Sequence, residues 1–276
     1  MRSVVALLAL CLSTLSAQNA KIGPPKGHLV VVGGGTLGPE IVNRFIELAG
    51  GKNARFVFIP TAGEEQSYDA KFLDRQFLAK AGVKNVTLLH TRDRKEADTK
   101  AFAEPLKTAT GVWFSGGRQW RLVDSYLNTR THREILNVLK RGGVVGGSSA
   151  GATIQGSYLV RGAREGNTIM MAPGYEVGMA LLKNVAVDQH LLVRKRQDDM
   201  VQVIQRHKQL LGIGIDESTA IVVTGDEFQV IGKSKVAIYD PKRPPESNAK
   251  HYFFLNAGDR FDLAHRQVLN GAASDR

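Results

Sequence analysis

A serine inside a cluster of small residues is the strongest chemical signal in this chain. The pentapeptide GSSAG at 147–151 matches the pattern G-x-S-x-G and closely follows an apolar run of valines. Such a serine sits on a sharp strand-to-helix turn, and its flanking glycines leave room for the strained backbone. The turn also directs backbone N–H groups toward an oxyanion. The pattern therefore indicates a nucleophile at Ser149, and an ordinary small-residue loop is the alternative.

A nucleophilic serine needs a base, and the base needs an acid that orients it. Of the seven histidines, His190 directly follows a strand-like segment in the half of the chain that contains Ser149. Glu217 ends another such segment. The alternatives are a structural histidine and a solvated turn at 216–217. The order Ser149, His190, Glu217 differs from the Ser–acid–His order of α/β-hydrolases and points away from esterases and lipases.

The elements that must position these residues follow from the apolar periodicity. Strands are expected at 28–32, 55–59, 85–89, 111–114, from 144, at 185–187 and at 212–217. Helices are expected at about 41–48, 67–81, 97–108, 120–127, 133–140 and 197–209. This alternation predicts an α/β fold with a mostly parallel sheet and helices on both faces. The segments at 220–231, 236–239 and 252–255 predict antiparallel strands toward the C-terminus.

The glycine-rich segment Gly33–Gly38 follows the first strand and formally satisfies G-x-G-x-x-G. A dinucleotide site would also need an acid at the end of the second strand, to hold the ribose. That position carries Ile59-Pro60-Thr61 instead. A glycine-rich strand exit that lines another pocket is therefore the preferred interpretation, with nucleotide binding as the alternative.

The N-terminal segment predicts export. Residues 1–20 have a basic start, an apolar run too short to span a bilayer, and small residues suited to cleavage, as in a signal peptide. Residues 21–27 are expected to be a linker and 28–276 a single α/β domain. The only cysteine, Cys11, lies in the predicted signal peptide, so a mature protein in the periplasm or outside the cell would have no thiol chemistry, thiolate metal site or disulfide.

The formal charge of +11 favours anionic or carboxylate-bearing partners. The basic residues are scattered, and neither an RNA-binding aromatic signature nor a helix-turn-helix pattern accompanies them. We expect no nucleic-acid partner and no membrane partner after removal of the signal peptide. The sequence leaves open whether the chain forms a homodimer.

The chain resembles the cyanophycinase and dipeptidase E family of serine peptidases, whose fold is similar to that of class I glutamine amidotransferases. The matching segments follow the family's order over nearly the whole chain, and Asp-Gln-His together with the long C-terminal part favours the cyanophycinase branch. These segments are 30–35, 59–62, 114–119, 147–151, 188–190 and 214–220.

The resemblance implies a role for each matching residue. Ser149 would be the nucleophile, His190 the general base and then acid, and Glu217 the orienting carboxylate. The N–H groups of Gly117 and Ala150 would form the oxyanion hole. Substrate contacts would come from Gln119, Asp188, Gln189, Arg194 and Arg196. No metal or cofactor is implied.

Two departures from the family pattern concern the substrate. Arg118 stands where the family carries Asp or Asn, and Asp198-Asp199 stand where cyanophycinases carry a further arginine.

The leading hypothesis is an exported serine exopeptidase or isopeptidase acting on peptides with a free carboxylate, such as β-aspartyl or related acidic peptides. Guanidinium groups suit that carboxylate, and an acid such as Asp188 suits a cationic group. The alternative is a non-catalytic binding protein on the same fold.

Overall fold

The computed structural model describes residues 21–69, 71–243 and 250–269. The predicted signal peptide at 1–20 lies outside the described residues, as does most of the polar loop expected at 241–250. Within the described residues, no helix combines the length and apolar character needed to cross a bilayer.

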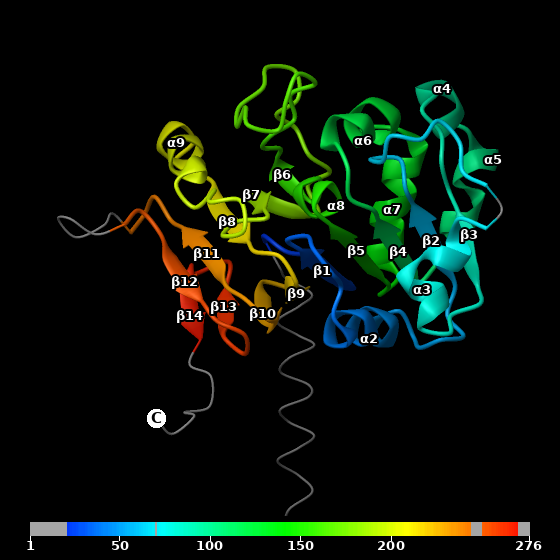
Figure 1. Ribbon diagram of the computed structural model, residues 1–276, viewed down its shortest axis with the longest axis horizontal. Helices are drawn as coiled ribbons and strands as arrows, with labels where there is room; N and C mark the ends of the chain where they lie inside the picture. Colours follow the sequence, from blue (N-terminus) through cyan, green and yellow to red (C-terminus); the bar gives the residue numbers. More distant parts are fainter. Residues whose placement is uncertain (1–20, 70, 244–249, 270–276) are drawn as a thin grey trace, which may run out of the picture.

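The larger of two sheets has nine strands, five from the N-terminal part of the chain and four from the C-terminal part (Figure 1). Four of its five parallel strands are almost wholly buried, as expected where both faces of a sheet are covered, and only the strand at the outer edge is partly exposed. In spatial order the five parallel strands are β3 (Val86–Leu88), β2 (Phe56–Ile59), β4 (Gly111–Phe114), β5 (Val144–Ser148) and β1 (His28–Val32). Beyond β1 the sheet continues with antiparallel pairing through β9 (Thr219–Thr224), β10 (Glu227–Gly232), β13 (Arg260–Asp262) and β14 (Gln267–Leu269).

A second sheet of five strands packs beside the first and was not predicted as a separate layer. Its strands are β6 (Gly156–Tyr158), β7 (Leu182–Gln189), β8 (Leu211–Ile215), β11 (Val236–Tyr239) and β12 (Phe253–Leu255). The first three are parallel and the last two antiparallel. One apolar core contains residues of both sheets, among them Val31, Val187 and Ile213. The predicted fold class, mostly parallel with antiparallel strands toward the C-terminus, is confirmed.

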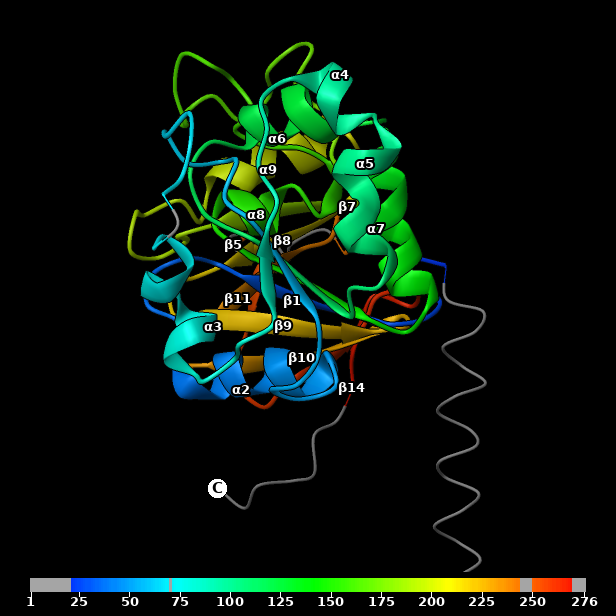
Figure 2. The ribbon, with the colours of Figure 1, turned by 90° about the vertical axis from the view of Figure 1, so that its right-hand side faces the viewer.

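Helices cover both faces of the large sheet (Figure 2). The lower face of the sheet in Figure 2 is covered by α2 (Pro39–Leu48) and α3 (Phe77–Lys80). The opposite face is covered by α4 (Arg94–Ala97), α5 (Lys100–Ala103), α6 (Gln119–Tyr126), α7 (Arg130–Lys140) and α8 (Ala150–Thr153). The second sheet carries α9 (Asp199–Arg206) on its outer face.

Two expected helices are wrong in extent. The helix expected at 67–81 is reduced to the 3-10 turn η1 (Leu73–Arg75) and to α3. The helix expected at 97–108 is divided into α4, α5 and η2 (Glu104–Lys107). The Thr99 hydroxyl accepts a hydrogen bond from the N–H of Phe102 and so starts a new helix, and Pro105 has no N–H to continue one.

The predicted linker contains no regular element but is bound to the fold. The backbone N–H groups of Lys21, Ile22 and Gly23 all donate to the Asp226 carboxylate, at 2.7–3.0 Å. Three backbone donors on one carboxylate fix the segment against the turn between β9 and β10.

The core beneath β5 is an aromatic cluster. The Phe45 ring lies 5.0 Å from that of Trp113, and Trp113 lies 4.7 Å from Phe77, each pair edge to face. A side chain at Gly146 would meet both Trp113 and Phe45, at 2.7 and 2.9 Å. The cluster therefore packs directly on the backbone of β5, the strand that leads to Ser149.

We expect Phe45→Ala to destabilise the fold by about 3–5 kcal/mol, because Phe45 is fully buried and its removal leaves a cavity under β5. Urea unfolding followed by circular dichroism measures the effect. Val193→Ala is the control and should change stability by less than about 0.5 kcal/mol, because that side chain is 62% exposed. Equal losses in the two variants would contradict this account of the core.

Candidate active site

The carboxyl ends of five parallel strands meet at one edge of the two sheets. Ser149 directly follows β5 and His190 directly follows β7. Glu217 follows β8 with one residue between them. The glycine-rich loops at 33–35 and 116–117 follow β1 and β4, which flank β5. Ligands of open α/β sheets bind at such edges. The sequence-predicted residues are thus drawn from both sheets to one place.

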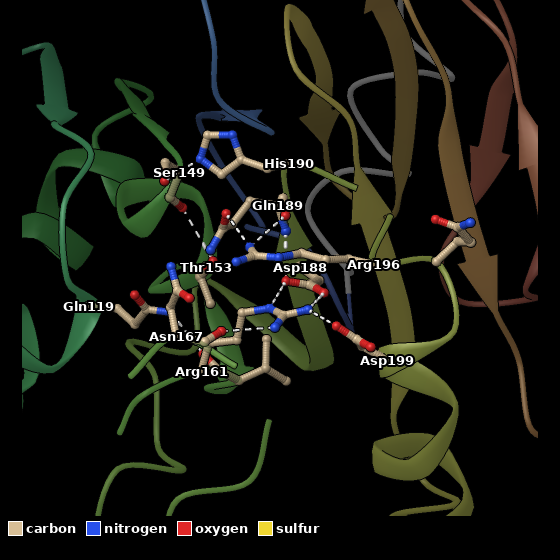
Figure 3. Close-up of polar contacts among 12 residues, drawn as sticks. Gln119, Ser149, Thr153, Arg161, Asn167, Asp188, Gln189, His190, Arg196 and Asp199 are labelled. Atoms are coloured by element: carbon tan, nitrogen blue, oxygen red, sulfur yellow. Dashed lines mark hydrogen bonds and ion pairs between the residues drawn. The ribbon is translucent and has the colours of Figure 1, made fainter. Parts of the chain in front are cut away.

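Ser149, His190 and Glu217 form a continuous hydrogen-bonded chain. The Ser149 Oγ lies 2.9 Å from Nε2 of His190 (Figure 3), and His190 Nδ1 lies 2.5 Å from Oε1 of Glu217. With Nδ1–H donating to the carboxylate, Nε2 is left to accept the serine proton. The His190 side chain is 9% exposed and that of Glu217 is 28% exposed, so the chain is sheltered yet open to a ligand.

Two members of this chain have left-handed backbone conformations. The φ angle is +57° at Ser149 and +54° at His190, a region that costs energy for residues other than glycine. Neighbouring backbone holds both in place: the Ser149 N–H donates to Val32 O at 3.0 Å, and the His190 N–H donates to Gly33 O at 2.8 Å. The end of β1 thus fixes the two side chains against each other.

The glycine-rich loop after β1 packs against the imidazole and the carboxylate. A Cβ at Gly34 would lie 2.2 Å from the His190 ring, and one at Gly35 would lie 2.8 Å from the Glu217 carboxylate. Both glycines also have positive φ angles, +121° and +70°. These contacts account for glycine at positions 34 and 35 and agree with a strand exit that lines another pocket. Nucleotide binding at this loop stays an untested alternative.

The predicted oxyanion donors lie on two sides of Ser149. Ala150 is the first residue of α8 and follows the serine directly. Gly117 belongs to the loop after β4, in which a Cβ at Gly116 would lie 3.8 Å from Ser149 Oγ. Within the described ranges, neither the Gly117 nor the Ala150 N–H donates to a protein acceptor outside the helices and strands. This is compatible with the predicted oxyanion role, which stays a prediction.

The loop that carries Gly117 is held rigidly. A Cβ at Gly117 would lie 2.0 Å from Ala62 O, and the next N–H, of Arg118, donates to the same oxygen at 2.8 Å. The Arg118 guanidinium turns away to donate to Ala163 O at 2.5 Å. This departure from the family pattern thus ties the loop after β4 to the loop after β6.

Gln119, Gln189 and Arg196, three of the predicted substrate-contacting residues, lie below Ser149 in Figure 3, and we call this region the floor of the site. Gln119 is buried and donates through Nε2 to Val160 O at 3.0 Å. Gln189 is buried, and its Oε1 accepts from the Arg196 guanidinium at 3.1 Å. Arg194, in contrast, is exposed and close enough to His190 to act on it electrostatically, and we call its position the rim of the site. These placements are compatible with substrate contacts, which stay predictions.

Asp188 is not free to receive a cation in this structure. Its carboxylate is fully buried and is paired in a two-point contact with Arg161, at 2.7 and 2.8 Å. Sequence reasoning missed Arg161, because no local pattern shows that a cation in the loop after β6 pairs with an acid at the end of β7.

Sequence reasoning also missed the function of Asp216. Asp216 is 5% exposed, accepts from the N–H groups of Leu192 and Val193 at 2.8 and 3.1 Å, and accepts from the Ser234 hydroxyl at 2.7 Å. Asp216 therefore fixes the loop after His190 and does not lie in a solvated turn. Its position at the end of a buried strand was the available signal.

The surrounding charges act on the imidazole. Burial lowers the pKa of His190 below 6.5, the hydrogen bond that His190 donates to Glu217 opposes this, and the Arg194 cation lowers the pKa further. Burial, followed by repulsion from Arg161, lowers the pKa of Arg196 to about 10. At neutral pH His190 is therefore neutral and able to accept a proton, while the arginines stay charged.

The described part of the chain contains no group of three or more His, Cys, Asp or Glu side chains arranged to hold a metal ion. The expectation that no metal or cofactor is needed stays a prediction.

We expect Gly34→Ala to lower the rate at which a serine-reactive phosphonate labels Ser149 by about 10²-fold, because the added methyl displaces the imidazole. Mass spectrometry of the labelled peptide measures the rate. Gly38→Ala is the matched control, since a Cβ there meets nothing within 4 Å. Unchanged labelling of Gly34→Ala would show that the loop does not position His190.

Comparison with known proteins identifies the family. Residues 29–231 match the family described as Peptidase family S51. A cyanophycinase from Geminocystis herdmanii is 33% identical over 267 residues, covering 89% of this chain and 97% of that protein. A cyanophycinase from Trichormus variabilis is 32% identical over 282 residues, covering 92% and 93%. A solved structure of a peptidase from an acI-B1 Actinobacterium has a TM-score of 0.67 at 26% identity, covering 86% of this chain and 97% of that one.

The family match extends over more than half of the chain, and both relatives align along nearly their whole length. The chain therefore belongs to peptidase family S51 and is a serine peptidase of the cyanophycinase type.

Proposed function

We propose that the protein hydrolyses β-aspartyl or related acidic peptides, with Ser149 as nucleophile, His190 as general base and then acid, and Glu217 as the carboxylate that orients the imidazole. The observation that carries this assignment is the unbroken hydrogen-bonded chain from Glu217 through His190 to Ser149. A nucleophile, a base and an orienting acid in this geometry define the triad of serine hydrolases.

The reaction has two halves. Ser149 Oγ attacks the scissile carbonyl carbon while its proton moves to Nε2 of His190, and the resulting oxyanion accepts hydrogen bonds from Gly117 and Ala150. When the tetrahedral intermediate collapses, the amine leaves with the proton from His190. Water then attacks the acyl-enzyme ester while losing a proton to His190. The bond between the acyl carbon and Ser149 Oγ breaks, His190 returns the proton to Oγ, and the acid product leaves.

The cations around the site support an acidic substrate. Arg196 lies below Ser149 and Arg194 at the rim, so a peptide with a free carboxylate is attracted to both. In a β-aspartyl peptide the free α-carboxylate lies next to the scissile bond, within reach of a guanidinium fork. The names of the two relatives point to cyanophycin as a first substrate to test.

The same proposal includes export to the periplasm or the cell exterior after cleavage of residues 1–20. It rests on the basic start and short apolar run of that segment. Fractionation of cells that express the full chain, with N-terminal sequencing of the product, tests this part of the proposal separately.

We expect Ser149→Ala to lower kcat on a β-aspartyl dipeptide by about 10⁴-fold or more, because the acyl-enzyme cannot form. Release of free aspartate, followed by chromatography, measures the rate, and thermal unfolding checks that the fold is intact. Ser148→Ala is the matched control, since it removes a neighbouring hydroxyl and should retain activity. Full activity of Ser149→Ala would refute the assignment. A wild-type protein that binds peptides but is neither active nor labelled at Ser149 would be a binding protein.

We expect kcat/KM to fall with decreasing pH through a pKa below 6.5, because only neutral His190 accepts the serine proton. Arg194→Gln removes a cation that lowers this pKa, so the acid limb should move to higher pH. An exposed charge contributes about 0.2–1 kcal/mol, which corresponds to a shift of roughly 0.2–0.7 pH unit. Lys195→Gln is the control and should leave the limb in place. A shift of the Arg194→Gln limb to lower pH is incompatible with this explanation.

A further inference from the structure

The Asp188 carboxylate receives all of its ion pairing from inside the protein. Arg161 is 1% exposed and Asp188 is 0% exposed. The Arg161 Nε donates to Oδ1 at 2.7 Å and Nη2 donates to Oδ2 at 2.8 Å, and the Gln189 N–H adds a third hydrogen bond to Oδ1. A buried charged carboxylate without a partner is strongly unfavourable, so the Arg161 cation stabilises the ionised form of Asp188.

Every nitrogen of the Arg161 guanidinium is occupied. Besides Asp188, Nη2 donates to the Asp199 carboxylate at 2.6 Å, and Nη1 donates to Asn167 O at 2.9 Å. Asp199 is the first residue of α9, and its side chain is 40% exposed. One buried cation thus neutralises an acid at the end of β7 and holds a second acid at the start of α9.

This pair lies on the floor of the candidate active site. Figure 3 shows Arg161 and Asp188 below Arg196, whose guanidinium points toward Gln189 and the space under Ser149. Asp188 also immediately precedes Gln189-His190 in the chain. A substrate that reached Asp188 would therefore have to displace Arg161 or take its place.

The charged groups at and next to Arg196 are three arginines, at 161, 194 and 196, and two acids, Asp188 and Asp199. A third acid, Glu217, is hydrogen-bonded to His190. Asp188 and Asp199 are both paired with Arg161, which leaves Arg194 and Arg196 to act on a ligand. A cationic side chain on the substrate would meet repulsion from these two arginines and no free carboxylate at Asp188.

We propose that the Arg161 guanidinium takes the place next to Asp188 that a cationic group of the substrate would otherwise occupy. The enzyme is therefore selective for β-aspartyl peptides whose second residue is neutral or acidic, and it discriminates against those whose second residue is arginine or lysine. This inference rests on the proposed function and adds its substrate class. Arg161 is a specificity-determining and positioning residue rather than a catalytic one, because it touches neither the nucleophile nor the base.

The direct test compares kcat/KM of the wild-type protein on β-Asp-Leu, β-Asp-Glu and β-Asp-Arg. We expect the first two to exceed the third by about tenfold or more, which corresponds to about 1.4 kcal/mol. A wild-type preference for β-Asp-Arg, or equal rates, would overturn the inference while leaving the proposed function intact. Cleavage of none of the three would overturn the proposed function and the selectivity with it.

Variants of Arg161 test the cause of the selectivity. Arg161→Ala frees Asp188 and should raise the ratio of kcat/KM for β-Asp-Arg over β-Asp-Leu by about tenfold, whereas Arg161→Lys keeps a cation and should retain the wild-type ratio. Arg161→Ala/Asp188→Asn removes the buried acid and leaves only the half-exposed Asp199, so it should not gain activity on β-Asp-Arg if Asp188 is the acid that receives the cation. An equal fall in kcat/KM on all peptides in Arg161→Ala would mean that Arg161 only holds the loop, contrary to the inference.

A binding measurement that needs no turnover completes the test. Millimolar guanidinium chloride should raise the melting temperature of Arg161→Ala relative to the same concentration of sodium chloride, because the ion fills the position next to Asp188. It should not stabilise the wild type or the Arg161→Ala/Asp188→Asn variant. Absence of this difference in a folded Arg161→Ala protein would show that Asp188 does not accept an external cation. If Arg161→Ala does not fold, the wild-type substrate ratio still decides the proposal.

Discussion

The site depends on two strained backbone positions being held together by one strand end. Ser149 and His190 both have left-handed φ angles, and the hydrogen bonds that fix them come from Val32 and Gly33, at the exit of β1. A single segment thus sets the serine, from the large sheet, against the imidazole, from the second sheet. Neither side chain could approach the other if the two sheets did not share a core at this edge. The 2.9 Å contact is therefore a product of tertiary packing, not of local sequence.

Glycine is required where this packing is closest. Gly34 and Gly35 combine positive φ with would-be Cβ contacts of 2.2 and 2.8 Å to His190 and Glu217, so any other residue would be strained and would also displace a member of the chain. Gly38, the last glycine of the same pattern, meets nothing within 4 Å. The pattern G-x-G-x-x-G can therefore occur both in a nucleotide-binding loop and in a loop that packs against a histidine side chain. Only the neighbours in space distinguish them.

The parts of the fold that the sequence predicts are those governed by short-range patterns. The buried runs of β1, β2, β4 and β5 and the glycine-rich strand exits follow from composition alone, and with them the place of Ser149 at a strand end. Helix extents failed at 67–81 and at 97–108. In the second segment, capping by Thr99 and the missing N–H of Pro105 compete with the apolar spacing. The second sheet was missed, because the choice of a strand's neighbour is a long-range decision.

The candidate site shows the same division. The spacing predicts Ser149, His190 and Glu217 as separate strand-end residues, and the structure brings them into hydrogen-bond contact. Their catalytic roles remain the proposal made above. Arg161 could not be predicted, because its significance arises from Asp188, 27 positions away. An isolated arginine in a loop is ordinarily a solvated surface residue.

The buried charges also explain how a general base can function among so many cations. Arg194 and Arg196 both lower the pKa of His190, which keeps the imidazole neutral but opposes the imidazolium that forms when it takes the serine proton. Glu217 offsets this through its hydrogen bond to Nδ1. A second offset lies below, where Asp188 and Asp199 partly screen the field of the arginines. Without Arg161, these two acids would leave negative charge on the floor that could draw cations to it. The paired arrangement keeps the floor attractive to a carboxylate and leaves Glu217 as the acid in direct contact with the base.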